Sequence, residues 1–182
     1  YQAFGHHFDF IAIPIIKKRL RMDTSQVIIN EERPQLTKHL ATRFKEKIGQ
    51  NVNLLGEVVL GNEEADHRYH HYLEALESPD INYISVKISG IYAQTHALNY
   101  EESFPELVSR MSALYQKAID FPYTDEDGIK RSKFINLDME EYKDAHFTLR
   151  LFKAVLNLPQ FKNYSAGIVV QAYLPLSIIH LS

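Results

Sequence analysis

Cysteine is absent from the 182-residue sequence. The absence excludes disulfides, thiolate nucleophiles and cysteine-ligated zinc, and it fits a reducing compartment. Long apolar runs are missing too, because the longest, residues 10–16 and 166–170, fall far short of the roughly 20 residues that a membrane-spanning helix needs. The first run precedes Lys17-Lys18-Arg19, which reverses the charge order of a signal peptide. We therefore expect a cytoplasmic protein.

The sequence also lacks a basic stripe, a Gly/Ser-rich linker and any low-complexity segment. Its 20 basic and 23 acidic residues are dispersed and give a net charge of −3. A nucleic-acid-binding domain normally gathers its Lys and Arg on one face, so no nucleic-acid partner is expected for this segment. The length favours one globular domain, and the 45% hydrophobic content is ordinary for one.

The first 50 residues are predicted to form a helical lead-in. Residues 11–20 indicate a short helix interrupted at Pro14, and residues 34–48 indicate a second helix that stops at Gly49. The apolar residues of the second helix share one face, at helical spacing: Leu36, Leu40, Phe44 and Ile48.

From residue 51 onward, apolar runs typical of strands alternate with helical patterns. The predicted strands are residues 52–56, 81–88, 134–138 and 167–173. The predicted helices between them are residues 62–77, 104–119 and 142–156. Strands separated by helices of this length pair in parallel, because a parallel return needs a crossover connection. The runs are nearly continuous in apolar residues, which predicts that both faces of the sheet are covered.

Two folds fit this alternation: an open doubly wound sheet, or a (β/α)8 TIM-type barrel cut at its midpoint. A dinucleotide-binding version of the open sheet is disfavoured, since residues 56–61 carry glycine only at their two ends and no G-x-G-x-x-G follows the first strand.

Polar residues stand at the carboxyl end of every predicted strand. They are Glu57, Lys87, Asp138 and Gln171. Ligands of parallel α/β proteins bind at this end, so a sheet that closes would direct all of these side chains toward one centre. A purely structural ring of ion pairs, Lys87 with Glu57 or Asp138, is the alternative interpretation.

The sequence alone leaves two chemical roles for Lys87. A desolvated, neutral amine forms a Schiff base with a carbonyl substrate, whereas a charged ammonium binds a carboxylate. Carboxylates on the same rim, from Glu57 and Asp138, favour the charged form and hence the second role.

The histidine cluster is less informative. His67, His70 and His71 have i, i+3 and i+4 spacings that suit a metal, but they fall opposite the predicted apolar face of their helix, so a solvated face is the preferred interpretation and no metal is expected. Tyr92 and Tyr173, just past strand ends, are weaker site candidates.

Four segments together resemble a known family. They are residues 53–57, 83–89, 136–141 and 168–173, which read NLLGE, YISVKIS, NLDMEE and IVVQAY. In this order and spacing they are similar to the proline dehydrogenase domain of the bifunctional bacterial proteins called proline utilization A. The resemblance implies a partial (β/α)8 barrel that binds FAD and oxidises L-proline to Δ1-pyrroline-5-carboxylate. Residues 1–50 would be the lead-in, and residues 51–182 the first four β/α units.

The resemblance also implies roles for the strand-end residues. Lys87 matches the lysine that pairs with the proline carboxylate, and Asp138 matches the active-site aspartate on the third strand. Gln171 matches a flavin contact, and Glu57 matches the carboxylate that pairs with a substrate-gating arginine. A membrane quinone is the implied electron acceptor, and a homo-oligomer is left open.

The sequence departs from the family pattern near residue 176. Leu176 stands where the family usually has an aspartate after Leu-Pro, and the four further strands and the helix bearing a tyrosine and paired arginines are not matched. We therefore expect this chain alone neither to hold FAD tightly nor to oxidise proline. The competing hypotheses are a non-catalytic barrel fragment or assembly partner, and a barrel lyase that uses Lys87 as a Schiff base.

Overall fold

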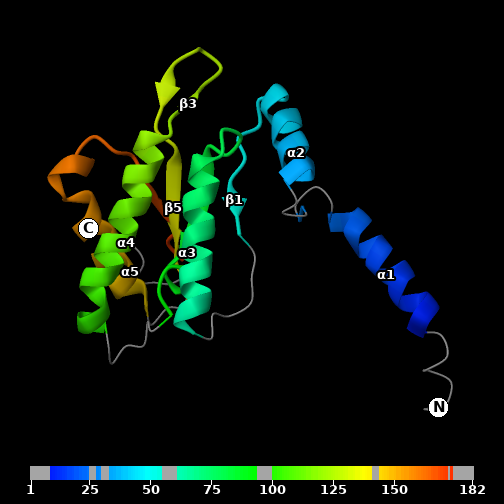
Figure 1. Cartoon of the computed structure of the whole chain (residues 1–182), viewed down its shortest axis with the longest axis horizontal. Coiled ribbons are helices and arrows are strands. Elements are labelled where there is room, and N and C mark those ends of the chain that lie inside the picture. Colours follow the sequence, from blue (N-terminus) through cyan, green and yellow to red (C-terminus); the bar gives the residue numbers. More distant parts are fainter. Residues whose placement is uncertain are drawn as a thin grey trace. The chain divides into compact units, whose positions relative to one another are not determined.

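The computed structural model describes residues 9–24, 28–29, 33–54, 61–93, 100–140, 144–171 and 173. It divides into one unit of residues 1–47 and a second of residues 48–182. The described residues of the first unit form α1 (Asp9–Thr24) and α2 (Arg33–Lys45). The second holds β1 (Val52–Asn53), α3 (Asn62–Glu77), β2 (Tyr83–Lys87), η1 (Ile88–Gly90), α4 (Tyr100–Asp120), β3 (Tyr123–Thr124), β4 (Lys130–Arg131), β5 (Phe134–Asp138), α5 (Ala145–Leu156), η4 (Pro159–Phe161) and β6 (Gly167–Ile168) (Figure 1).

Both helices of the first unit differ from the prediction. α1 continues through Pro14, its sixth residue, although the proline cannot donate the backbone hydrogen bond of that turn. α2 ends at Lys45, and Lys47 takes the left-handed conformation (φ 60°) that terminates helices, in place of the predicted stop at Gly49. Among the described helices, none has the length and apolarity to cross a lipid bilayer.

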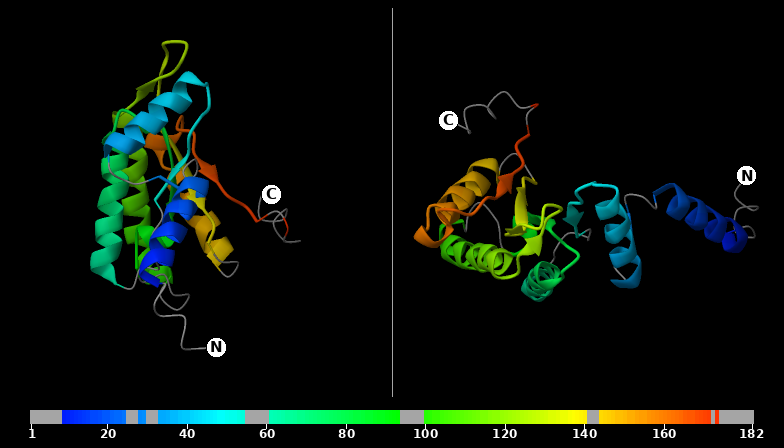
Figure 2. Two further views of the ribbon diagram at one scale, coloured as in Figure 1. Left: turned by 90° about the vertical axis from the view of Figure 1, so that its right-hand side faces the viewer. Right: turned by 90° about the horizontal axis from the view of Figure 1, so that it is seen from above.

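The second unit is built on a parallel sheet with the order β1-β2-β5-β6. Each neighbouring pair is parallel, which confirms the predicted pairing. Along the chain, α3 packs against α4 and α4 packs against α5, so the three helices lie on the same side of the sheet (Figure 2). The strand side chains under these helices are aliphatic and almost fully buried: Ile84, Val86, Ile135 and Leu137.

The helices present matching apolar faces to this side of the sheet. In α4 the fully buried side chains follow helical spacing: Leu107, Met111, Leu114, Tyr115 and Ala118. Burying each of the larger ones stabilises the fold by about 1.5 to 3 kcal/mol. In α3, Ala65, Tyr72 and Leu76 are buried, as their period predicted.

The other side of the sheet, here called the polar face, carries polar side chains together with two aromatic rings: Ser85, Lys87, Asn136 and Asp138, with Tyr83 and Phe134. β5 alternates between buried aliphatic and half-buried side chains, the latter being Phe134, Asn136 and Asp138. Because strand side chains alternate between faces, each strand contributes one residue in two to this polar face.

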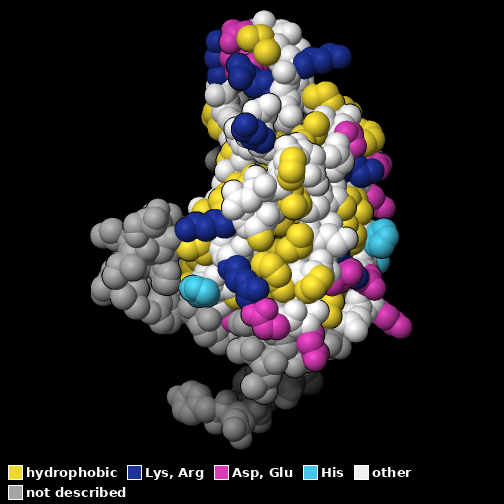
Figure 3. Space-filling model, turned by 90° about the vertical axis from the view of Figure 1, so that its left-hand side faces the viewer, with side chains coloured by type: hydrophobic (Ala, Val, Ile, Leu, Met, Phe, Trp, Pro, Cys, Tyr) yellow, Lys and Arg dark blue, Asp and Glu magenta, His cyan; other side chains and the backbone are white. Residues whose placement is uncertain are grey.

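A short antiparallel hairpin, β3 with β4, precedes β5 where the sequence suggested only a loop. The Asp125 carboxylate closes its turn by accepting hydrogen bonds from the Asp127 N–H (3.0 Å), the Ile129 N–H (2.8 Å) and the Arg131 guanidinium. Gly128 supplies the left-handed residue of the turn (φ 77°). Charged side chains of both signs gather at this end of the molecule, at the top of Figure 3.

Lys133, just before β5, is a buried cation at the amino end of the sheet. Its side chain is 1% exposed, and its ammonium donates a hydrogen bond to the Ser78 carbonyl. Burial lowers the pKa of Lys133 to about 8, although the negative charge of Asp80 opposes this shift. Folding therefore favours the neutral amine at this position.

We predict that the stability of the chain rises with pH because of Lys133. The folded chain releases the proton near pH 8 and the unfolded chain near 10.5, so unfolding takes up a proton between these values. Urea unfolding from about pH 7 to about pH 9.5, below the titration of buried tyrosines, should show this rise, and Lys133→Met should flatten it. Lys130→Met in the exposed hairpin is the matched control. Equal pH slopes in wild type and Lys133→Met would contradict the prediction.

Candidate functional site

Lys87 and Asp138 lie opposite each other at the carboxyl ends of β2 and β5. They form the last pair in the register of these two strands. Paired residues of neighbouring strands point to the same face, so both side chains belong to the polar face of the sheet. Both are half-buried. The structure thus brings together two of the four predicted site residues.

Neutral donors from three strands surround the Asp138 carboxylate. Oδ1 accepts hydrogen bonds from the Ser85 hydroxyl at 3.1 Å and from the Asn136 amide at 3.0 Å. Oδ2 lies 3.5 Å from the Asn53 amide nitrogen. These donors orient the carboxylate but do not cancel its charge. A salt bridge would cancel it.

Ser85 is the most enclosed member of this network, at 2% exposed. Its hydroxyl oxygen accepts a hydrogen bond from the Asn51 amide at 2.8 Å, which leaves the hydroxyl proton directed at Asp138. One layer toward the amino end, the rings of Tyr83 and Phe134 pack edge to face with centroids 5.0 Å apart. The hydrogen-bonded side chains of Ser85, Asn136 and Asp138 therefore lie next to these two aromatic rings.

Gly167 in β6 makes room for this packing. A Cβ at residue 167 would meet the Asn136 amide oxygen and would lie 3.0 Å from two ring carbons of Phe134. Any other residue at position 167 would displace these side chains. The lack of a side chain at Gly167 therefore lets Asn136 and Phe134 pack against the backbone of β6.

The segment after β2 is fixed to the helices behind it. Burial raises the pKa of the Tyr72 hydroxyl, and the nearby Lys87 backbone opposes the rise. A Cβ on Gly90 would lie 2.9 Å from the Tyr72 oxygen, so Gly90 permits the close approach. Farther along, the Arg110 guanidinium donates to the Ile91 carbonyl at 3.0 Å.

Arg110 joins this segment to α3 and α4. It forms ion pairs with Asp66 (2.6 Å) and Glu106 (2.7 Å) and lies over the rings of Tyr69 and Tyr92. Burial alone would lower the pKa of Arg110, but the hydrogen bonds and negative charges of Glu106 and Asp66 together outweigh it, so the pKa is raised. Tyr92, a weaker candidate from the sequence, thus has a packing role here.

The Lys87 ammonium has no ion pair with any carboxylate in the part of the chain that the structure describes. Gln171, three residues beyond β6, is half-buried. Glu57 lies outside the described residues, so its predicted place on the rim stays a prediction. Tyr173 is 79% exposed.

The histidine cluster lies on the solvent side of α3. His67 and His70 are exposed and His71 is half-buried. The His67 and His71 rings lie 4.4 Å apart, and His70 Nδ1 hydrogen-bonds to the Asp66 carbonyl at 2.7 Å. Within the described ranges, no group of three His, Cys, Asp or Glu side chains is arranged to hold a metal ion.

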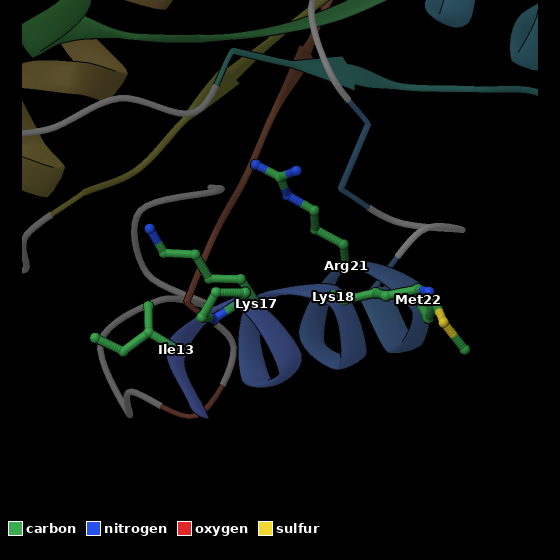
Figure 4. Close-up of a pocket in the computed structure, with 6 residues that line it drawn as sticks. Ile13, Lys17, Lys18, Arg21 and Met22 are labelled. Atoms are coloured by element: carbon green, nitrogen blue, oxygen red, sulfur yellow. The ribbon is translucent and has the colours of Figure 1, made fainter. Parts of the chain in front are cut away.

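An open hollow in the first unit does not involve the strand-end residues. Only side chains of α1 line it: Ile13, Pro14, Lys17, Lys18, Arg21 and Met22. Lys17 and Arg21, one helical turn apart, extend from the same side of the helix (Figure 4).

Sequence reasoning missed the residues that orient Asp138. Asn53, Ser85 and Asn136 were assigned to strands but to no site. The available signal was their period of two with the strand ends: Ser85 precedes Lys87 by two residues, and Asn136 precedes Asp138 by two.

A family model described as proline dehydrogenase matches residues 36–181. A comparison with curated proteins found no match. Among solved structures, the chain is similar to proline utilization A from Corynebacterium freiburgense, with a TM-score of 0.78, 35% identity and 100% of this chain covered. It is also similar to the Bdellovibrio bacteriovorus protein inactivated by N-propargylglycine, with a TM-score of 0.77, 28% identity and 93% covered.

The chain spans 19% of the length of each of these two proteins. The family model covers most of the described second unit, including both strands that carry Lys87 and Asp138. This chain belongs to the proline dehydrogenase family.

Proposed function

We propose that this chain, as part of a complete (β/α)8 barrel, oxidises L-proline to Δ1-pyrroline-5-carboxylate with FAD as cofactor. The observation that carries the proposal is the Lys87–Asp138 pair, an ammonium and a carboxylate on adjacent strands of a proline dehydrogenase family member. Substrates of parallel α/β folds bind at this end of the strands. L-Proline is a zwitterion, so two opposite charges on neighbouring strands complement it.

The proposed architecture is a partial (β/α)8 barrel. The described strands follow chain order across the sheet, and α3, α4 and α5 lie on one side of it. Both features favour a barrel, since a doubly wound sheet reverses its strand order and carries helices on both faces. Residues 51–182 would contribute four β/α units, with the polar face toward the barrel axis, and residues 1–50 would precede them.

Lys87 binds the substrate carboxylate in this proposal. Its ammonium faces the polar side of the sheet and, within the described part of the chain, has no carboxylate partner to release first. A salt bridge is preferred over a Schiff-base role because the chain belongs to the proline dehydrogenase family and the proposed substrate carries a carboxylate that a lysine can bind.

Asp138 stabilises the charge that develops on the substrate. Once the ring nitrogen has released one proton to solvent, loss of hydride from the neighbouring ring carbon lets the nitrogen lone pair form a carbon–nitrogen double bond, and positive charge builds up on the nitrogen. A carboxylate already oriented by Ser85 and Asn136 meets this charge without reorganising. The Asp138 carboxylate would stabilise the transition state less if its side chain had to rotate into place during the reaction.

FAD, when bound, supplies the hydride acceptor. The donor set at the rim fits a flavin, because the Gln171 amide both donates and accepts hydrogen bonds and so suits the carbonyl and N–H groups of the ring. We propose that Gln171 contacts the flavin and that Glu57 pairs with an arginine that gates the substrate. A membrane quinone is the proposed final electron acceptor, and the cytoplasm the proposed location.

The function is tested in a chimera in which this chain replaces the matching segment of the Corynebacterium freiburgense protein. We predict that the chimera oxidises L-proline and passes the electrons to a redox dye, whose reduction is measured. Lys87→Ala should lower kcat/KM about 10- to 100-fold, mainly through KM, because one charge-assisted contact to the carboxylate is lost. Asp138→Asn should act mainly on kcat, about 10-fold or more.

Lys153→Ala, an exposed lysine of α5, is the matched control and should leave turnover unchanged. A chimera that holds flavin but does not oxidise proline would contradict the proposed function. Lys87→Ala with wild-type kinetics would contradict the proposed role of Lys87.

We further predict that the 182-residue chain alone does not hold FAD tightly or oxidise proline. A (β/α)8 barrel closes with eight strands, and the described sheet has four. After incubation with FAD and dialysis, the chain should show no flavin absorbance band. A yellow protein that retains one flavin per chain would contradict this expectation.

A further inference from the structure

The hydrogen-bonded ladder of β2 and β5 stops at Lys87 and Asp138, but one side chain joins the two segments beyond it. The Glu140 carboxylate accepts a hydrogen bond from the Ser89 N–H through Oε2 at 3.1 Å. Its other oxygen, Oε1, accepts one from the Ser89 hydroxyl at 2.8 Å. Ser89 and Glu140 each lie two residues past the strand-end charge on their own strand.

This contact is a two-point clamp made by an exposed carboxylate. Both hydrogen bonds are charge-assisted, and both come from one residue, so the carboxylate is held in one orientation. Ser89 lies in the first turn of η1, where backbone N–H groups have no partner inside the helix. Glu140, two residues beyond β5, supplies that partner.

Contacts from the helices hold the same segment on its other side. The Tyr72 hydroxyl packs closely against Gly90, and the Arg110 guanidinium donates a hydrogen bond to the Ile91 carbonyl. These contacts fix the segment relative to α3 and α4. In the described part of the chain, the Ser89–Glu140 pair is the side-chain hydrogen bond that ties this segment to the residues following β5, the strand that carries Asp138.

We infer that Glu140 is a positioning residue that sets the spacing and orientation of Lys87 relative to Asp138. The inference rests on the proposed function, because these two charges matter together only if one ligand spans them. Loss of the clamp frees the segment after β2 to shift relative to β5. The Lys87 ammonium then meets the substrate carboxylate less favourably, and misplacement of about 1 Å costs up to about 100-fold in rate.

The first test uses the 182-residue chain and does not depend on activity. By NMR, Glu140→Ala should speed hydrogen exchange at the Ser89 N–H about 10-fold and should move the Lys87 side-chain resonances. Glu140→Gln should restore most of the protection, because the amide oxygen still accepts from the N–H and the amide group still bonds the hydroxyl. Glu102→Ala, an exposed acidic residue of α4, is the matched control.

The second test measures kinetics in the chimera. Glu140→Ala should lower kcat/KM for L-proline about 10-fold, mainly by raising KM, with Ser89→Ala in between and Glu140→Gln close to wild type. If the unsubstituted chimera is inactive, the proposed function fails while the NMR result still reports on the clamp. Unchanged Ser89 exchange and Lys87 resonances in Glu140→Ala, or equal kinetics for the alanine and glutamine variants, would overturn the inference.

Discussion

The parallel register between β2 and β5 is the constraint on which the second unit depends. It aligns five residue pairs, from Tyr83 with Phe134 to Lys87 with Asp138. Because side chains alternate between faces, this single alignment places aliphatic residues under the helices and polar residues on the opposite side. A slip of one residue would bury the charges and expose the core, so packing on one face fixes the chemistry of the other.

The described ion pairs of the second unit do not involve Lys87 or Asp138, so both charges at the strand ends can contact a ligand. Arg110 is paired with Asp66 and Glu106 on the helices, whereas Asp138 is held by neutral hydroxyl and amide groups. In the described residues Lys87 and Asp138 do not form an ion pair with each other, which argues against that version of the structural ring. A carboxylate oriented by neutral donors keeps its charge for a ligand, and this distinction separates a binding site from a structural salt bridge.

The sequence predicted the periodic parts of this fold well. The bounds of α3 and β5 match the predicted residues 62–77 and 134–138. In both segments the spacing of the apolar residues and the residues that end the element indicate the same bounds. The polar face was missed because runs rich in Tyr, Ile and Val look continuous in apolar character even where Ser85 or Asn136 interrupts them. The β3–β4 hairpin depends on the Asp125 side chain closing its own turn. The Ser89–Glu140 contact joins residues 51 apart and could not be inferred before the strands were aligned.

The most direct measurement is a crystal structure of the chimera with L-proline bound. The account predicts that the Lys87 ammonium lies within about 3 Å of the proline carboxylate, at hydrogen-bonding distance. It also predicts that Asp138 faces the ring nitrogen and that Ser85 and Asn136 remain hydrogen-bonded to its carboxylate. Proline bound without contact to Lys87, or with Lys87 paired to Asp138 and turned away from the ligand, would contradict the account.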